Sequence, residues 1–446
     1  MKNLNFETVR SVTGGTLRGN PFAGELSAVT SDSRAVTPGC LFAAVRGGHD
    51  FIAAALDAGT ACVLAERVPE GLPAGCALLV PDTVAALQAL AGFYRSQFDI
   101  PVLGVTGSVG KTTAKEMAAA VLGRRFRVHK TAGNYNNDLG AALTLLGLRE
   151  EHTAAVVELG VSHPGDMARI AAIARPTMAL YTNIGDAHLE FLGDRPGVLR
   201  EKSVMNRFLP ADGVVLCNGD DPLLAGMDCP QKKLTYGLGK NCALRAEDLR
   251  MLPGAATACT IAGAGRRFAV TIPAFGEYLA YAALGAAAAG LALGLTEEEI
   301  AAGIGDYAPV GSRGRLVHTE SLTVIDDCYN ANPTSVAAAL RSLSRAPGRK
   351  VAVLGDMLEL GERSPALHRA TGELARECGV TLLLCAGADC IHLAAGAGEI
   401  ARHYPDRAAL IDALPSLLRP GDTVLVKASR SMKFEEIAAA LEALKL

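Results

Sequence analysis

No two cysteines of this 446-residue sequence stand in a C-x-x-C pair. The eleven cysteines are odd in number and are scattered from Cys40 to Cys390. Neither a disulfide framework nor a zinc ribbon is indicated, because both depend on regularly spaced cysteines. Unpaired cysteines are typical of proteins in a reducing compartment, so we expect this chain to be cytoplasmic.

The sequence also lacks an excess of basic residues. Its 43 Lys and Arg residues stand against 46 Asp and Glu residues, which gives a formal net charge of −3. A nucleic-acid-binding scaffold needs a basic surplus, so we expect no nucleic-acid partner. Apolar residues make up 50% and charged residues 20%, which is the balance of a globular enzyme. At about 100 to 200 residues per domain, the length predicts two to four domains.

The N-terminal segment has no apolar core of the kind found in signal peptides, because Lys2 and Arg10 stand among polar residues. One uncharged stretch, Leu279 to Leu295, approaches the roughly 20 residues that span a membrane. It is rich in alanine and glycine, and the acidic segment LTEEEI follows it. Small residues let a helix pack closely on its neighbours, so we predict a buried interior helix and no stable membrane insertion.

Alternating strand-like and helix-like segments divide the chain into three blocks. Residues 1–97 combine short apolar segments such as CLFAAVRG with helical ones such as VAALQALAGFYRSQF. Residues 98–310 begin with the apolar strand IPVLGVTG and the helix TTAKEMAAAVLGRRF, and residues 311–446 repeat strand and helix. We expect an α/β protein of three domains: a small N-terminal one, a central parallel-sheet P-loop domain and a C-terminal Rossmann-like domain.

A glycine-rich turn, GVTGSVGKTT at 104–113, lies between the predicted strand and helix that open the central block. Gly107 and Gly110 allow backbone N–H groups to surround phosphate oxygens, and the helix directs its positive end at them. Lys111 would neutralise the terminal phosphates, and Thr112 would bind Mg²⁺. Val105 stands where the usual motif has its first glycine, so an ordinary Gly-rich turn is the alternative. ATP or GTP is the expected ligand.

Two residues that follow predicted strands are candidates for a metal site. Glu158 ends the apolar strand AAVVELG, and His188 follows the strand MALYTNIG. Loop residues after parallel strands converge on ligands, and Mg²⁺ prefers hard oxygen ligands. Taken singly, Glu158 is as typical of a solvated strand end, and His188 of a structural histidine.

The motifs TAGNYNND, VVELGVSHPGDM and TNIGDAHLEFLG, followed by Lys202, come after this loop. Together they resemble the central domain of the Mur ligases, which build the peptide of bacterial cell-wall precursors. The outer motifs look like the member that adds D-alanyl-D-alanine to UDP-MurNAc-tripeptide. They are SDSR at 31–34, DDCYNANPTSV at 326–336, LGDMLELGERS at 354–364 and KASRSMKFEE at 427–436. SDSR alone is weak, whereas DDCYNANP and LGDMLELGE in this order are highly specific.

The resemblance implies a role for each residue that matches a family motif. The triphosphate loop would consist of Gly107, Ser108, Val109, Gly110, Lys111, Thr112 and Thr113. Thr112 and Glu158 would bind one Mg²⁺, and His188 with a carbamylated Lys202 would bind a second; Lys111, His188 and Lys202 would be the catalytic residues. ATP would also be contacted by Arg315, Asp327 and Asn330. The substrates would be bound by Ser31, Ser33, Arg34, His49, Asn134, Asn136, Asn137 and Asn332. Without the resemblance, the Asn134 to Asn137 segment is equally typical of a turn, and Arg34 of a surface charge.

The chain departs from the family in several places. Where the family has Gly-x-His-Asn-x-x-Asn around the adenine, this chain has GEYLAYA at 276–282, so Tyr278 and Leu279 are predicted to hold the base by stacking and apolar contact. Weak discrimination between ATP and GTP should follow. Milder differences are Ala142, Val204, Cys328 and Ala428.

The chemistry that the resemblance implies is ATP-dependent condensation of a carboxylate with an amine through an acyl phosphate. The positive charge of Lys111 and of two Mg²⁺ ions would offset the repulsion between the carboxylate and the triphosphate. We expect a monomer whose third domain closes on the ligands. The alternatives are another Mur ligase, a folylpolyglutamate synthetase-like ligase, or a nucleotide-binding protein that has lost catalysis.

Overall fold

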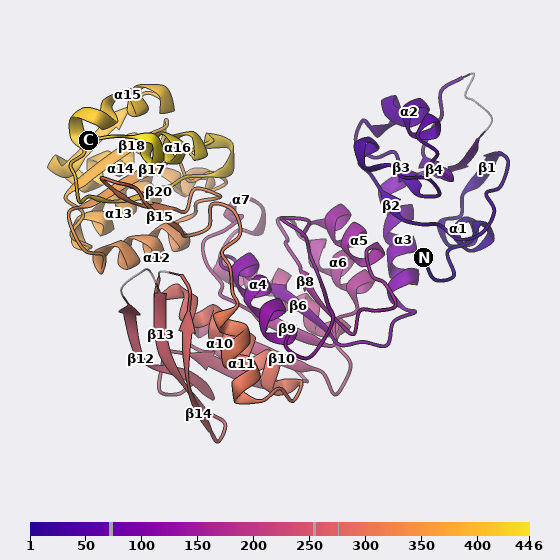
Figure 1. Ribbon diagram of the computed structural model, residues 1–446, viewed down its shortest axis with the longest axis horizontal. Coiled ribbons are helices and arrows are strands. Elements are labelled where there is room, and N and C mark those ends of the chain that lie inside the picture. The colour runs from indigo at the N-terminus through magenta and orange to yellow at the C-terminus, as the bar shows by residue number, and fades with distance from the viewer. Residues whose placement is uncertain (71–74, 253–255, 275) are drawn as a thin grey trace.

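The computed structural model describes residues 1–70, 75–252, 256–274 and 276–446. Three β-sheets lie one after another along the molecule, with the N-terminal sheet at one end and the C-terminal sheet at the other (Figure 1). We call the parts built on them the N-terminal, central and C-terminal units. The predicted α/β class with three sheet-based parts is confirmed.

The N-terminal unit has a five-stranded sheet in the order β1-β5-β4-β3-β2, parallel except for β1 at the edge. Its elements are α1 (Phe6–Thr13), β1 (Thr16–Gly19), β2 (Val29–Thr30), η1 (Ser33–Ala35), β3 (Leu41–Ala43), η2 (Gly48–Phe51), α2 (Ile52–Asp57), β4 (Cys62–Ala65), β5 (Cys76–Leu79) and α3 (Thr83–Arg95). Helix α3 joins this unit to the central one, because Arg95 Nε donates to Ala174 O at 3.1 Å and Tyr94 Oη donates to Leu148 O at 3.0 Å.

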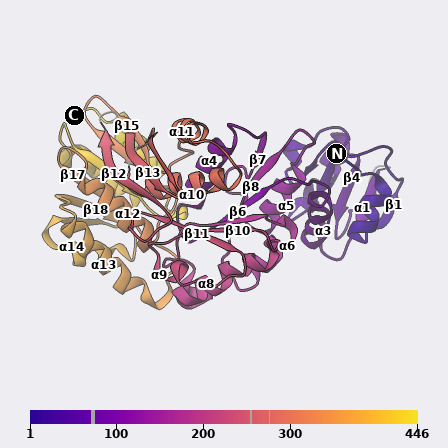
Figure 2. The same ribbon diagram turned by 90° about the horizontal axis from the view of Figure 1, so that it is seen from below.

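The central unit has a nine-stranded sheet in the order β14-β13-β12-β11-β10-β9-β6-β8-β7. Its elements are β6 (Val102–Thr106), α4 (Lys111–Leu122), β7 (Val128–Lys130), α5 (Asp138–Leu146), β8 (Ala154–Glu158), α6 (Asp166–Ala174), β9 (Met178–Tyr181), α7 (Leu189–Leu192), α8 (Arg195–Ser203), η3 (Val204–Phe208), β10 (Val214–Asn218), α9 (Pro222–Ala225), β11 (Lys232–Gly237), β12 (Leu244–Leu252), β13 (Ala256–Gly263), β14 (Arg266–Ile272), α10 (Tyr278–Ala292) and α11 (Glu297–Gly305). Helices α4, α10 and α11 share the hydrophobic core on one face of the sheet, and α5, α6 and α8 share the core on the other (Figure 2).

The central sheet is parallel only in part. Strands β12, β13 and β14 form an antiparallel edge, which the sequence analysis did not predict. Strands β13 and β14 are joined by Ala264 and Gly265, whose φ angles are 50° and 75°. Two left-handed residues between antiparallel strands give the tight turn whose twist matches the strands, so the AGAGRR segment carried a hairpin signal.

The C-terminal unit has a six-stranded sheet in the order β15-β16-β20-β17-β18-β19, parallel except for β15. Its elements are β15 (Arg315–His318), β16 (Thr323–Asp326), α12 (Pro333–Ser344), β17 (Lys350–Gly355), η4 (Gly361–Arg363), α13 (Ser364–Glu377), β18 (Leu382–Ala386), α14 (Cys390–Ala397), η5 (Gly398–Ile400), β19 (Ala401–Tyr404), α15 (Arg407–Leu417), β20 (Thr423–Lys427), η6 (Arg430–Met432) and α16 (Glu435–Ala443). Its two faces have separate hydrophobic cores.

The uncharged stretch near residue 280 forms α10, and its side chains from Ala282 to Ala289 are buried, as predicted. A Cβ at Gly290 would lie 3.0 Å from Val121 Cγ1, so α10 packs closely on α4. In the described part of the chain, no helix is both long and apolar enough to cross a membrane.

Candidate active site

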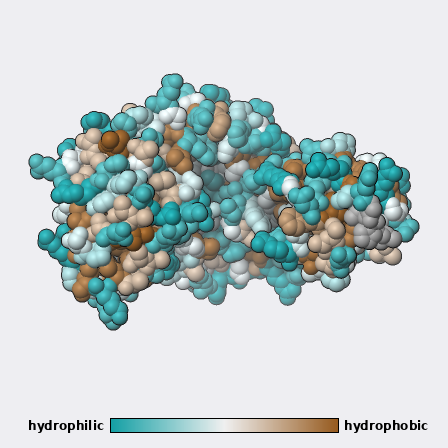
Figure 3. Space-filling view, turned by 90° about the horizontal axis from the view of Figure 1, so that it is seen from above, coloured by the Kyte–Doolittle hydropathy of each residue, from teal (hydrophilic) through white to brown (hydrophobic). Residues whose placement is uncertain are grey.

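A cavity of about 820 Å³ lies where the central and C-terminal units meet. The central unit contributes the turn after β6, the carboxyl ends of β8, β9 and β10, and the start of α10. The C-terminal unit contributes the segment after β16, helix α12 and Lys427 at the end of β20. The face shown in Figure 3 is hollowed near its middle, where hydrophilic residues predominate. We call the 820 Å³ cavity between the central and C-terminal units the cleft.

The turn between β6 and α4 has a backbone that only glycine adopts easily. Gly107 has φ 147°, and a Cβ there would lie 1.9 Å from Thr182 Oγ1; Gly110 has φ 78°. Both positions are therefore strained for any other residue. The turn lies at the N-terminus of the twelve-residue helix α4, where free N–H groups favour a bound anion.

The residues that follow β9 hold this turn in place, and the sequence analysis did not find them. Ser108 N donates to Asn183 O at 2.9 Å, and Val109 N donates to Asn183 Oδ1 at 3.0 Å. Thr182 Oγ1 donates to Val109 O at 2.6 Å. Lys111 folds back so that its Nζ donates to Gly107 O at 2.8 Å, and desolvation lowers its pKa. Its ammonium group thus already lies at the turn that a triphosphate would occupy.

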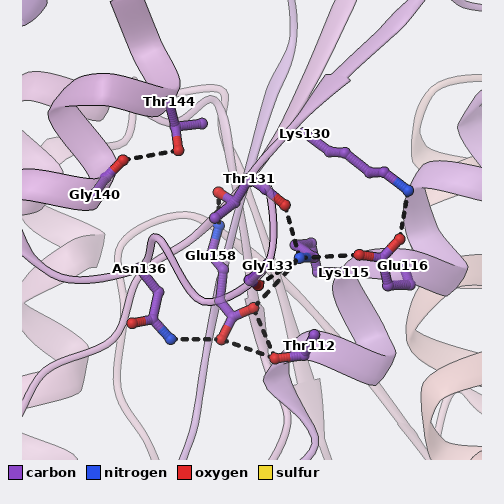
Figure 4. A network of polar contacts seen from close by, with 10 residues as sticks. All are labelled: Thr112, Lys115, Glu116, Lys130, Thr131, Gly133, Asn136, Gly140, Thr144 and Glu158. Atoms are coloured by element: carbon purple, nitrogen blue, oxygen red, sulfur yellow. Dashed lines mark hydrogen bonds and ion pairs between the residues drawn. The ribbon is translucent and has the colours of Figure 1, made fainter. Parts of the chain in front are cut away.

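Thr112 and Glu158, the predicted ligands of one Mg²⁺, are in direct contact (Figure 4). Thr112 Oγ1 donates to Glu158 Oε2 at 2.9 Å, and Asn136 Nδ2 donates to Glu158 Oε1 at 2.8 Å. Thr112 is 3% exposed and Glu158 is 1% exposed. A hydroxyl and a carboxylate held side by side next to a phosphate-binding turn suit Mg²⁺, which prefers oxygen ligands. This pair fits one ion.

Behind Glu158 lies a fully buried lysine that the sequence analysis missed (Figure 4). Lys115 Nζ donates to Thr131 O at 2.7 Å, and it lies 3.0 Å from Glu116 Oε1 and 3.8 Å from Glu158 Oε2. Lys115 lies one helical turn after Lys111, on the side of α4 that faces β8. That i, i+4 spacing was the available signal.

The asparagine loop between β7 and α5 lines the cleft with Asn134, Asn136 and Asn137. Asn137 Oδ1 also accepts from Gly140 N at 2.8 Å and thereby caps the N-terminus of α5. The turn interpretation therefore holds for Asn137, whereas Asn136 reaches the metal-site candidate Glu158.

His188 and Lys202 occupy different surroundings. His188 lines the cleft with φ 56°, and its Nδ1 lies 2.7 Å from Glu359 Oε2 of the C-terminal unit. Lys202 is fully buried in α8, and among the described residues its Nζ has no hydrogen-bond partner. Burial, aided by the charge of Lys111, lowers the pKa of Lys202 well below its usual value.

The four predicted metal ligands are therefore not all in contact. Only Thr112 and Glu158 are hydrogen-bonded to each other among them in the described residues. Within the described ranges, no three His, Cys, Asp or Glu side chains converge on one metal position. The second metal site stays a prediction.

The C-terminal wall of the cleft differs in part from the prediction. Asp327 and Asn330 line the cleft, and Asp327 Oδ2 lies 2.6 Å from Lys427 Nζ. Burial raises the pKa of Asp327, and Lys427 opposes that shift. Asn332 also lines the cleft, and its Oδ1 accepts from Ser335 N at 2.9 Å as the N-cap of α12.

Arg315 does not point where the resemblance implied. In the described structure its guanidinium pairs with Asp326 at 3.1 Å and with Glu442 at 2.5 Å, because β15 places it on the sheet beside α16. Arg313, two residues earlier, lines the cleft and lies over the Tyr329 ring, 3.7 Å from its centroid. In this conformation Arg313, and not Arg315, is in the lining of the cleft that contains the phosphate loop.

The predicted uridine-end residues lie in the N-terminal unit, away from the cleft-lining set. Ser31, Ser33 and Arg34 are in or beside η1, and Arg34 Nε donates to Asp32 Oδ1 at 2.9 Å. This pairing lowers the pKa of Asp32 to about 2. His49 Nε2 lies 3.5 Å from Glu66 Oε2. Among the described residues, none of these contacts joins one of the four predicted residues to another.

In the segment that replaces Gly-x-His-Asn-x-x-Asn, Tyr278, Tyr281 and Ala282 line the cleft. Leu279 is 1% exposed and belongs to the hydrophobic core between α10 and the sheet. The predicted apolar contact of Leu279 with a base is therefore wrong in this structure, because the helical repeat turns Leu279 inward.

Family comparisons agree with this geometry. Residues 105–290 match the Mur ligase middle domain, and residues 312–430 match a family described as Mur ligase, glutamate ligase domain. A relative from Bacillus subtilis (strain 168), UDP-N-acetylmuramoyl-tripeptide–D-alanyl-D-alanine ligase, is 38% identical over 422 residues, which are 92% of this chain and 92% of that protein.

Two solved structures have the same fold. A crystal structure of MurF from Acinetobacter baumannii superimposes with a TM-score of 0.92 at 30% identity and covers 99% of both chains. MurF ligase from Thermotoga maritima, solved in complex with ADP, superimposes with a TM-score of 0.83 at 28% identity, over 93% of this chain and 97% of that one.

Proposed function

The chain belongs to the Mur ligase family, and we propose that it joins D-alanyl-D-alanine to UDP-MurNAc-tripeptide with consumption of ATP. The product would be UDP-MurNAc-pentapeptide for peptidoglycan synthesis. The observation that carries the proposal is the phosphate-binding turn of α4, with Lys111, Thr112 and Glu158 gathered beside it in a cleft shared by two units. The similarity to the UDP-N-acetylmuramoyl-tripeptide–D-alanyl-D-alanine ligase from Bacillus subtilis over 92% of the chain supports the choice of substrates.

The reaction forms an amide from a carboxylate and an amine. The tripeptide carboxylate attacks the γ-phosphorus of ATP and displaces ADP, which yields an acyl phosphate. The dipeptide amine then attacks the acyl carbon, loses a proton, and releases inorganic phosphate. A carboxylate is already a nucleophile, so the first step needs no strong base in the protein.

The central unit supplies the electrostatic part of this chemistry. Lys111 Nζ can exchange its hydrogen bond to Gly107 O for a contact with the phosphates of ATP. The free N–H groups at the start of α4 are directed at the same phosphates. Thr112 and Glu158 would hold Mg²⁺, which when bound offsets the negative charge of the triphosphate. Glu158 is kept in position by Asn136 and Lys115.

Lys202 is proposed to act as a carbamate and, with His188, to hold a second Mg²⁺. Full burial and a lowered pKa favour the neutral amine, which is the form that reacts with CO₂ and releases a proton. The carbamate would be an anionic oxygen ligand in place of an ammonium group. His188 would exchange its contact with Glu359 for the metal.

The three units are proposed to divide the substrates among residues 1–97, 98–310 and 311–446. The first would bind the uridine end through Ser31, Ser33, Arg34 and His49, the second ATP, and the third the dipeptide. Asp327, Asn330 and Arg313 would approach the nucleotide from the C-terminal wall, and Asn332 would contact a substrate. We also propose that the enzyme is cytoplasmic, since its substrates are ATP and nucleotide-linked precursors, and that it is a monomer.

The test is phosphate release with purified protein, ATP, Mg²⁺ and UDP-MurNAc-tripeptide, with and without D-alanyl-D-alanine. Release that depends on the dipeptide, with formation of the pentapeptide by mass, is expected. Matched reactions with D-glutamate or L-lysine in place of D-alanyl-D-alanine test whether the enzyme joins another amine to the tripeptide. Release that is independent of any amine would indicate a nucleotide-hydrolysing switch and would refute the proposal.

A further inference from the structure

Tyr281, on α10, lines the cleft, and its hydroxyl proton is used in a hydrogen bond to a neighbouring carboxylate. Tyr281 Oη donates to Asp220 Oδ2 at 3.0 Å, and both residues line the cleft. Tyr281 lies one helical turn after Tyr278, in the segment where the expected His and Asn side chains are missing. The Tyr281 hydroxyl therefore lies where it can replace the missing contact to the base.

Two backbone N–H groups hold Asp220 in place, and its carboxylate oxygens accept hydrogen bonds from them. Its Oδ1 accepts from Gly239 N at 2.9 Å, and its Oδ2 accepts from Leu238 N at 2.6 Å. The fit to this turn is tight, since a Cβ at Gly239 would lie 2.4 Å from Oδ1. With Tyr281 added, Oδ2 has two donors, which matches its two lone pairs. The carboxylate thus fixes both the ring of Tyr281 and the direction of its O–H bond.

The consequence for Tyr281 follows from the count of its hydrogen-bonding groups. A phenol has one proton and two acceptor lone pairs. The proton points at Asp220, so the oxygen can offer only lone pairs to a ligand in the cleft. Burial and the charge of Asp220 raise the pKa of Tyr281, which keeps that proton in place.

The opposite side of the cleft is suited to a flat ring. Helix α12 contributes Ala338, Ala339 and the guanidinium-bearing Arg341. Beside them, Arg345 Nη2 pairs with Glu277 Oε2 at 2.7 Å and ties α12 to the start of α10. A purine bound between α12 and α10 would have the two alanines and the planar guanidinium group of Arg341 beside its faces. The Tyr281 hydroxyl would lie in the same cleft.

We propose that Tyr281, oriented by Asp220, selects a 6-aminopurine nucleotide over a 6-oxopurine nucleotide. The 6-amino group of adenine donates a hydrogen bond, which the Tyr281 oxygen accepts. The 6-oxo group of guanine or hypoxanthine would face the same lone pairs with no proton between them, and it would lose its contact with water. This replaces the weak discrimination expected from stacking alone. The inference rests on the proposed function in that the cleft must bind a nucleoside triphosphate.

The test is direct binding to the full chain, without tripeptide or dipeptide. ATP, inosine triphosphate and purine riboside triphosphate compete with a fluorescent ATP analogue, so that mainly the 6-position differs. For the wild-type protein we expect ATP to bind at least about tenfold more tightly than inosine triphosphate. Purine riboside triphosphate, which carries no 6-substituent, should fall between them.

Tyr281→Phe keeps the ring and removes only the hydroxyl, and it should reduce the ATP preference about tenfold. Tyr278→Phe is the matched control: the Tyr278 hydroxyl lies against Gly314 of the chain leading into the C-terminal unit, so the preference should not change. Equal binding of ATP and inosine triphosphate by the wild-type protein, or an unchanged preference in Tyr281→Phe, would overturn the proposal. Since no amide is formed in this assay, failure of ligation would refute the proposed function and leave the base selection intact.

Discussion

The two ends of the cleft at which we propose that the phosphates and the base of the nucleotide bind, here called the phosphate end and the base end, are built in different ways. At the phosphate end, Gly107 and Gly110 shape the backbone, and the charged or polar side chains of Lys111 and Thr112 follow directly in the sequence. At the base end, Tyr281 of α10 meets Asp220, which lies 61 residues away. The first end is a local motif, whereas the second is a product of tertiary packing.

This difference explains why one end keeps the family motif and the other does not. Backbone N–H groups bind phosphate whatever the surrounding side chains are, provided that the turn keeps its shape. A base is recognised by side chains, and several combinations present the same donors and acceptors. We therefore expect substitutions at the phosphate end to cost far more activity than substitutions at the base end.

The largest loss is expected for Lys111→Ala. Its ammonium group is the one positive side chain next to Gly107 O and Ser108 O in the described structure, so its removal leaves the phosphates without that charge. Ligation should fall by about a thousandfold or more, while the thermal melting temperature stays near the wild-type value. Lys240→Ala, at an exposed lysine, is the control and should retain activity. A folded Lys111→Ala variant that ligates at a near-normal rate would show that this turn is not the catalytic phosphate site.

A loss of about a hundredfold is expected for Lys202→Ala, since Lys202 is proposed to hold one of two Mg²⁺ ions. The variant should fold, and added acetate or formate should restore part of the activity by occupying the vacated ligand position. Carbon-13 bicarbonate gives an independent readout, because the wild-type protein should show a labelled carbamate signal that the variant lacks. Full activity without Lys202, or a wild-type protein with no such signal, would contradict the carbamate.

A smaller effect on catalysis, with a larger one on stability, is expected for Lys115→Met. The substitution keeps the apolar stem but leaves Glu116 and Glu158 without the buried ammonium group. We expect a loss of about 3 kcal/mol in the free energy of unfolding and weaker Mg²⁺-dependent ATP binding. Denaturant unfolding and ATP titrations with and without Mg²⁺ measure the two effects. Unchanged stability would show that Lys115 does not hold Glu158 in place.

The smallest effect is expected at the base end, for Arg345→Ala. Its ion pair with Glu277 joins the two walls, but the two side chains are 52% and 32% exposed, so water screens the charges. The KM for ATP should rise by about threefold or less. Glu277→Ala should give the same change, and the double variant should not add to it. A tenfold rise would mean that this ion pair controls domain closure.

Much of the phosphate end could be predicted from the sequence because its determinants are adjacent. The strand, the glycines and the helix start at Lys111 all lie within a dozen residues, and Glu158 marks the end of the next long apolar strand. The α/β class followed from the same alternation of strand and helix. The buried α10 followed from its small residues.

What the sequence analysis missed depends on contacts between distant segments. Asn183, which follows β9, supports the phosphate turn, and Lys115 supports Glu158 from inside α4. Arg313 lies in the segment before β15 and lines the cleft, whereas Arg315 is the first residue of β15 and pairs with Asp326. Apart from the i, i+4 spacing of Lys111 and Lys115, no periodicity or spacing signals these contacts, because they join segments that are far apart in the sequence or depend on where a strand begins.

The most direct test of the account follows oxygen through the reaction. The substrate is UDP-MurNAc-tripeptide labelled with oxygen-18 in its terminal carboxylate, and it is incubated with the protein, ATP, Mg²⁺ and D-alanyl-D-alanine. The masses of the products are then measured by mass spectrometry. An acyl phosphate passes one carboxylate oxygen to the phosphate, so we predict UDP-MurNAc-pentapeptide together with inorganic phosphate that carries the label. Unlabelled phosphate, or labelled substrate recovered without pentapeptide while ATP is consumed, would contradict the account.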